Sequence, residues 1–199
     1  MDPEERASVA TPLEEWLDRL AERGGAPGGG SASGVLLGIG AALLSMVLGY
    51  GERPGALRTR ATDLRAGALD AALRDAAASA ELGAALALPA DDPARPGRVA
   101  DAALAGARST AELGATGVAL VDLLEETATD TAPGLMADVG VAAEAIAAGL
   151  GGALTTLRGD LELVERYGSP IPGALTEAAE HMDAARRRAA ARATRIREP

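Results

Sequence analysis

The sequence predicts an all-α protein, a single-domain bundle of about six helices over residues 1–199 in which two or more long helices pack antiparallel. Three observations support this fold class. The 199 residues include 48 Ala, 27 Leu and 19 Arg, all good helix formers. Aromatic residues make up 2% of the chain and Phe is absent, so strand formers are scarce. Apolar residues recur at helical spacing between Gly- and Pro-rich breaks.

The composition excludes several functional classes. The chain has no Cys and no Lys, which rules out a disulfide scaffold, a thiolate metal site, a Cys nucleophile and Schiff-base chemistry. The single histidine, His181, cannot build a multi-His metal site, and its place on a polar segment predicts a surface residue. The net charge of −10 argues against nucleic acid as a partner. Residues 1–23 mix both charge signs and do not resemble a secretory signal, so we expect a cytoplasmic protein.

The first helix has a clear start. Thr11 is a natural N-cap, Pro12 fits the first helical position, and Glu14 completes a capping box. Four apolar residues then form one stripe at spacings of three and four, namely Leu13, Trp16, Leu17 and Leu20. Gly24 and Gly25 end this helix.

The second helix is expected from Ser31, its N-cap, to about Tyr50. No charged residue occurs between Gly24 and Gly51, and the apolar part approaches the length that spans a bilayer. A membrane-associated helical protein is therefore an alternative. We favour a buried core helix of a soluble protein with no membrane partner, because residues 24–34 are Gly-, Pro- and Ser-rich loop material.

Three long helices and a charged one follow. The third spans residues 56–88, and two more carry apolar and small residues at alternating spacings of four and three. These residues are Val99, Ala103, Gly106, Thr110, Leu113, Gly117, Leu120 and Leu124 in one helix, and Met136, Ala143, Leu150, Leu154, Leu157, Leu161 and Val164 in the next. Seams with this regular spacing predict close antiparallel packing, and we expect a dimer interface that uses the Gly- and Ala-lined faces of the second helix or of these two helices.

The last helix begins after residues 168–173 and ends in a basic segment with Arg186, Arg187 and Arg188. A nucleic-acid or membrane patch is one interpretation of this segment. A cationic helix end that complements the helix dipole and frays into solvent is the other, and the acidic bulk of the chain favours it.

The segment from Pro27 to Ser31 directly precedes the apolar second helix and contains Gly28, Gly29 and Gly30. Consecutive glycines indicate a sharp turn or a close approach of the backbone to a ligand. The backbone N–H groups at a helix start form an anion or oxyanion site. The alternative is a flexible connector that leads into a helix with Gly30, Gly34 and Gly38 on one packing face. The spacing matches neither a P-loop nor a dinucleotide-binding fingerprint.

Two aspartates lie among small apolar residues. Asp75 is the acid in Ala71–Ala78, and Asp138 lies in Met136–Ala143. A carboxylate in an apolar setting has a raised pKa and can act as an acid or base, so both are candidate catalytic residues. For Asp138, near a helix start, capping or pairing with an arginine is the alternative.

At these residues the sequence resembles the cyclodeaminase/cyclohydrolase family, found as the C-terminal part of formiminotransferase-cyclodeaminase and as free-standing bacterial proteins. Residues 26–31 followed by residues 41–47 look like the family's glycine loop and small-residue helix. Asp75 with residues 84–89 resembles its acid and closing Leu-Pro, and residues 138–143 with 151–154 resemble its SDxGVAA helix. The match runs over roughly residues 10–165.

The resemblance implies a homodimer that acts on a tetrahydrofolate derivative without metal or cofactor, by releasing ammonia from 5-formiminotetrahydrofolate or adding water to 5,10-methenyltetrahydrofolate. It implies Asp75 and Asp138 as acid or base. We expect residues 27–31 to bind the substrate, and Arg53 or Arg58 to meet the folate carboxylates.

Some polar family positions are missing. The family's first acid falls at Leu73, its aromatic residue falls at Ser79, and its asparagine-containing loop reads Thr131–Ala137 without asparagine. A catalytically inactive relative that keeps the fold and the dimer but binds another ligand or partner is therefore the main alternative.

Overall fold

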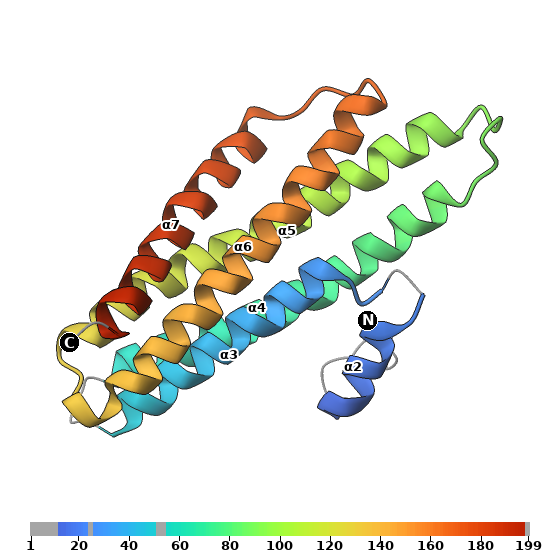
Figure 1. Cartoon of the computed structure of the whole chain (residues 1–199). Coiled ribbons are helices and arrows are strands. Elements are labelled where there is room, and N and C mark those ends of the chain that lie inside the picture. The colour runs from blue at the N-terminus through green and yellow to red at the C-terminus, as the bar shows by residue number, and fades with distance from the viewer. Residues whose placement is uncertain (1–11, 24–25, 51–54, 198–199) are drawn as a thin grey trace.

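The computed structural model of the chain describes residues 12–23, 26–50 and 55–197. All regular structure in these residues is helical, as the composition predicts (Figure 1). The elements are α2 (Leu13–Ala21), α3 (Gly29–Gly49), α4 (Gly55–Leu86), α5 (Arg95–Thr129), the short 3-10 helix η1 (Pro133–Leu135), α6 (Met136–Arg166) and α7 (Gly173–Arg197).

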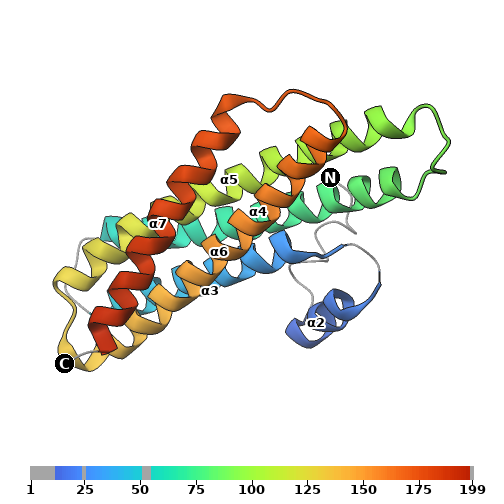
Figure 2. The same ribbon diagram turned by 45° about the horizontal axis from the view of Figure 1, so that its top comes forward.

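Helices α3, α4, α5 and α6 form an antiparallel four-helix bundle. Each packs against the next along the chain, and α6 closes the ring against α3. Helix α7 runs back along the outside of the bundle against α5 and α6 (Figures 1 and 2). The prediction of long antiparallel helices is confirmed, and the loops after α4 and α6 contain the expected prolines.

The seams of alternating spacing lie inside this bundle. All eight predicted positions of α5 are buried, and the small ones allow neighbouring helices to come close. A Cβ at Gly117 would lie 2.9 Å from Cγ of Leu150 on α6. Gly114 allows Met182 of α7 to come close in the same way, because a Cβ at Gly114 would lie 2.6 Å from Cγ of Met182. Gly114 and Gly117 of α5 therefore provide close packing within one chain.

One face of helix α3 is buried in the protein core. Gly34 packs against α4, where an added Cβ would lie 2.7 Å from Cβ of Ala72, and Leu37 and Leu44 are fully buried. By length and hydropathy, α3 and residues 133–166 could each cross a membrane, but half of the apolar window of α3 is buried inside the protein. The interpretation as a core helix agrees with this packing.

Two predicted helix ends need correction. Helix α3 begins at Gly29 with Gly28 as its N-cap, so Ser31 lies inside the first turn and is not the cap. Helix α2 has Pro12 as its N-cap, one residue later than expected, and Thr11 lies outside the described residues.

The basic end of the chain is not frayed. Helix α7 continues to Arg197, and two of its arginines pair with acids of α5 and α6. Arg188 contacts Asp122 at 2.9 Å and Glu125 at 2.7 Å, and Arg197 contacts Glu144 at 2.8 Å. These ion pairs hold α7 against α5 and α6, and they leave less cationic surface than the sequence indicated.

Candidate functional site

One layer of the four-helix bundle contains a cluster of buried polar residues. Each helix contributes to it, and the members are Ser31 of α3, Asp75 of α4, Thr110 of α5 and Asp160 of α6. The layer lies at the N-terminal end of α3, where the glycine segment enters the bundle. Sequence positions up to 129 residues apart, from Ser31 to Asp160, therefore meet at one place.

Asp75 is the centre of the cluster and is only 2% exposed. The Ser31 hydroxyl donates toward Oδ2 of Asp75 at 3.2 Å and toward the carbonyl oxygen of Ala72 at 3.0 Å. Thr110 donates to Oδ1 at 3.3 Å, and the backbone N–H of Ser31 adds a further hydrogen bond. Burial raises the pKa of Asp75 above its ordinary value, and these donors partly oppose that rise. The prediction of a raised pKa is confirmed.

At the N-terminal end of α3, one backbone N–H group therefore binds a side chain of the same protein. The Ser31 N–H group was expected to bind an anionic or carbonyl part of a ligand, yet it binds the carboxylate of Asp75. The helix dipole of α3 favours this negative charge. Asp75 therefore acts as a cap supplied by another helix.

Glycines make room for both carboxylates. A Cβ at Gly30 would lie 2.5 Å from Cγ of Asp75, and one at Gly106 would lie 2.9 Å from Oδ2 of Asp160. None of Gly28, Gly29 and Gly30 has a positive φ, so a left-handed backbone conformation does not explain the glycine run. Close approach explains Gly30, whereas a Cβ at Gly29 would make an ordinary 3.6 Å contact with Thr156.

Asp160 differs from Asp75 in its surroundings. It is 8% exposed, and burial together with the charge of Asp75 raises its pKa to about 7. A carboxyl group that titrates near neutral pH can both give and take a proton under ordinary conditions. Asp75 accepts hydrogen bonds that stabilise its anion, and its negative charge helps to raise the pKa of Asp160.

Comparison with known proteins agrees with this architecture. The sequence model of formiminotransferase-cyclodeaminase matches residues 12–165. The chain belongs to this family. The crystal structure of formiminotetrahydrofolate cyclodeaminase from Thermotoga maritima superposes with a TM-score of 0.80 at 20% identity, covering 94% of this chain and 96% of that one. This likeness shows that the two proteins share a fold. Among curated proteins, none matches the sequence.

The structure places the other predicted site residues of this family member as follows. Pro27 and Gly28 are half-buried and Gly29 is exposed, directly before and at the start of α3. Arg53 lies outside the described residues. Arg58 lies by Gly49 at the opposite end of α3, and nineteen helical residues from Gly30 to Gly49 span about 28 Å.

Asp138 does not join the cluster. It lies half-buried in the first turn of α6, whereas Asp160 lies 22 residues later on the same helix. At 1.5 Å per residue this separation is about 33 Å. The structure therefore brings Asp75 together with Asp160 and keeps Asp138 apart.

Asp160 and Thr110 were missed as site residues, although the sequence holds a signal for both. Asp160 lies three residues after Leu157 and four before Val164, so it occupies a core position of the α6 seam. Thr110 occupies such a position in α5. A polar residue on a helix face that is otherwise apolar needs a buried partner, and Thr110 finds it in Asp75. Asp160 lies close enough to Asp75 for the charge of Asp75 to raise its pKa.

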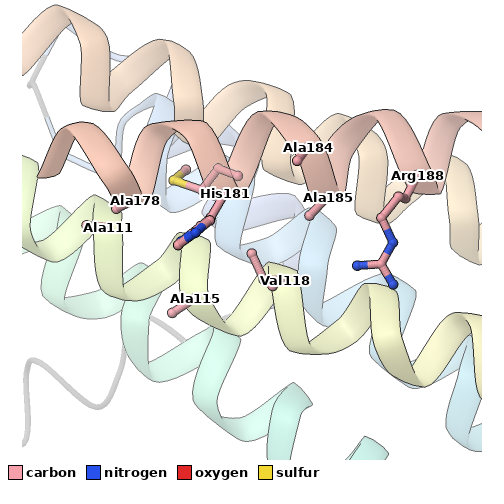
Figure 3. Close-up of a pocket in the computed structure, with 9 residues that line it drawn as sticks. Ala111, Ala115, Val118, Ala178, His181, Ala184, Ala185 and Arg188 are labelled. Carbon is pink, nitrogen blue, oxygen red and sulfur yellow. The ribbon is translucent and has the colours of Figure 1, made fainter. Parts of the chain in front are cut away.

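A hollow with a volume of about 470 Å³ lies between α5 and α7, away from the buried cluster (Figure 3). Its lining is mostly Ala with Val118 and Met182, and Arg188 and the exposed His181 lie at its edge. None of the predicted site residues lines it. Among the described residues, no group of three or more His, Asp or Glu side chains is arranged to hold a metal ion.

Proposed function

We propose that this protein is a folate-dependent one-carbon enzyme of the formiminotetrahydrofolate cyclodeaminase or methenyltetrahydrofolate cyclohydrolase type. The observation that carries the proposal is the carboxylate pair of Asp75 and Asp160, held in one layer of the bundle beside the glycine segment. Membership of the formiminotransferase-cyclodeaminase family supports the substrate class.

The pair fits the proton transfers of both reactions. Addition of water to the methenyl carbon releases a proton as the imidazoline ring opens, so a base is needed. Expulsion of ammonia from a formimino group requires that the leaving nitrogen receive a proton, so an acid is needed. Asp160, with a pKa of about 7, can fill either role. Asp75 remains the better stabilised anion, and its negative charge stabilises a cationic methenyl or amidinium group nearby.

Substrate binding is assigned to the surface around the start of α3. Pro27, Gly28 and Gly29 lead into the first turn of α3, which contains Ser31 of the cluster, and Arg53 remains the candidate for the folate carboxylates. The proposal includes the tetrahydrofolate derivative as the only small-molecule partner, with no metal and no further cofactor. It also includes a homodimer in the cytoplasm, without nucleic-acid or membrane partners.

One observation favours the alternative of an inactive relative. Asp75 is nearly inaccessible and its hydrogen bonds join α3, α4 and α5, which is what a purely structural cap would show. In that case the pair stabilises the fold and the protein binds a different ligand or partner.

Calorimetric titration with tetrahydrofolate derivatives distinguishes the two functions. The enzyme proposal predicts saturable binding of 5-formimino- or 5,10-methenyltetrahydrofolate to the wild-type protein and unchanged binding to Asp138→Asn, which lies outside the cluster. The absence of heat with any folate, from protein that circular dichroism shows to be folded, would favour the inactive relative.

A further inference from the structure

The Ser31 hydroxyl lies between two buried oxygens that both accept hydrogen bonds. Its Oγ is 3.0 Å from the carbonyl oxygen of Ala72 and 3.2 Å from Oδ2 of Asp75. A hydroxyl group has one hydrogen, so Ser31 can donate fully to only one of these oxygens at a time. Ser31 and Asp75 are each 2% exposed, and a buried polar contact without a hydrogen is unfavourable. While Asp75 is ionised, one of the two contacts therefore lacks a hydrogen.

A proton on Oδ2 of Asp75 supplies the missing hydrogen. The carboxyl group then donates from Oδ2 to Oγ of Ser31, and the Ser31 hydroxyl turns to donate to the carbonyl oxygen of Ala72. Both short contacts become hydrogen bonds. Ser31 can therefore serve both forms of Asp75, as a donor to the carboxylate and as an acceptor for the protonated acid.

Thr110 holds the other oxygen of the Asp75 carboxyl in a fixed way. Its hydroxyl donates to Oδ1 at 3.3 Å, and within the described residues this is the one acceptor that it has. Thr116 of the same helix shows the usual alternative, since its hydroxyl donates to the carbonyl oxygen of Glu112, four residues earlier. Because Oδ1 accepts in the carboxylate and in the acid alike, Thr110 donates to it in either form. The two oxygens of Asp75 thus differ, and Oδ2 is the one placed to carry a proton.

Asp160 is the buried titratable neighbour of Asp75. Helix α3 contains no charged residue. On α5, Arg108 is exposed, and Glu112 pairs at 3.4 Å with Arg74 of α4 on the outside of the bundle. On α6, Asp160 is close enough to respond to the charge of Asp75. Because two neighbouring carboxyls in a buried site are ionised together only at a high cost, we expect the pair to hold one proton around neutral pH.

We propose that Ser31 is a positioning residue that lets the pair hold a single proton in either of two places. In one state the proton is on Asp160, and Ser31 donates to Oδ2 of Asp75. In the other state the proton is on Oδ2, Ser31 donates to the carbonyl oxygen of Ala72, and Asp160 is ionised. Between the two states Asp160 loses one proton and Asp75 gains one, so the pair keeps a single negative charge.

The consequence for catalysis rests on the function proposed above. The first state presents Asp160 as an acid, which suits protonation of a leaving nitrogen. The second state presents Asp160 as a base, which suits removal of a proton from an attacking water. Asp75, which is nearly inaccessible, stores the proton while Asp160 is the base.

Carbon NMR of the carboxyl groups, on the full chain with isotope-labelled aspartate, tests this sharing without any folate. Asp75→Asn and Asp160→Asn assign the two signals. We expect both carboxyl carbons of the wild type to move through the same pH range around the pKa of about 7 of Asp160. An Asp75 signal that stays at its ionised position throughout this range would overturn the proposal, because Asp75 would then be a fixed anionic cap.

Three variants distinguish a switching hydroxyl from a fixed donor. Thr110→Val removes a donor from the carboxylate, so the Asp75 signal should titrate at higher pH than in the wild type. Ser31→Ala should act in the opposite direction and remove Asp75 from the neutral range, because the protonated acid would bury an O–H group without an acceptor. Ser33→Ala is the matched control and should leave the titration unchanged, since Ser33 is also 2% exposed but donates to the carbonyl oxygen of Gly29 in its own helix. An upward shift in Ser31→Ala, or no shift, would contradict the switch.

Steady-state turnover separates this proposal from the proposed function. Ser31→Ala should lower kcat about ten-fold on whichever folate the wild type converts, with KM little changed, and Ser33→Ala should keep the wild-type kcat. Shared titration of both carboxyls in a protein that converts no folate would support the proton switch and overturn the proposed function alone. Full kcat in Ser31→Ala would overturn the part of the switch in catalysis.

Discussion

Asp160 makes the stability of the protein depend on pH, and Asp160→Asn should remove that dependence. The pKa of Asp160 rises from its ordinary value of 3.8 to about 7 on folding, chiefly through burial. Between these two pH values the folded chain holds a proton that the unfolded chain has released, so the free energy of unfolding falls as pH rises. The pKa difference is roughly three, and each step of one corresponds to about 1.4 kcal/mol. Ionisation of Asp160 therefore costs up to about 4 kcal/mol above pH 7.

An asparagine resembles the protonated carboxyl in size and carries no charge. The Asn variant should therefore gain stability over the wild type as pH rises, by about 3 kcal/mol between about pH 5 and about pH 8. In a domain of this size about 4 kcal/mol corresponds to a rise in melting temperature of about 10 °C at the higher pH. Because Asp160 keeps some contact with solvent, these figures are upper limits.

Guanidinium unfolding followed by far-ultraviolet circular dichroism measures the effect at each pH. Asp138→Asn is the matched control, since it makes the same substitution on the same helix away from the cluster, and it should not show the pH-dependent gain. If Asp160→Asn is less stable than the wild type at both pH values, or if its gain does not change with pH, the assigned burial of this carboxyl is wrong.

Three further predictions concern glycines of α3. Gly30→Ala should destabilise the protein by about 1–3 kcal/mol in chemical denaturation, because its Cβ meets the Asp75 carboxyl; a neutral effect would contradict the tight contact. Gly38→Leu should cost about 1–3 kcal/mol by overpacking against Leu69, with Gly67→Leu, which faces open space, as the control. Gly29→Val should abolish folate binding in calorimetry while the melting temperature stays nearly unchanged, because Gly29 is exposed; equal loss of both would indicate a connector role.

The helices could be predicted because local signals determine them. Apolar spacing, proline breaks and the seam of α5 are properties of neighbouring residues, and all eight seam positions are buried as expected. The start of α3 could not be placed by the same means. Gly29 and Gly30 are poor helix formers, and they are helical because Asp75, 45 residues after Gly30, binds the first turn.

The site could be predicted only in part. Asp75 was identified by its apolar neighbours, but the same argument selected Asp138, which lies at the far end of α6. Periodicity shows that a residue faces the core, but it does not show which other core positions share its layer, so Asp160 was overlooked. Small residues at spacings of four and three look alike whether they meet a helix of the same chain or of another, so periodicity did not show that Gly114 and Gly117 pack within one chain.

We propose that Asp75 and Asp160 carry out proton transfer on a folate substrate. Steady-state turnover of 5-formimino- and 5,10-methenyltetrahydrofolate by the wild type, Asp75→Asn and Asp160→Asn tests it most directly. We predict wild-type turnover above the spontaneous rate on one of the two substrates, a loss of about 10²–10⁴ in each Asn variant with substrate binding largely kept, and full activity in Asp138→Asn. Wild-type protein that shows no rate above the background, or Asn variants that remain fully active, would contradict the claim.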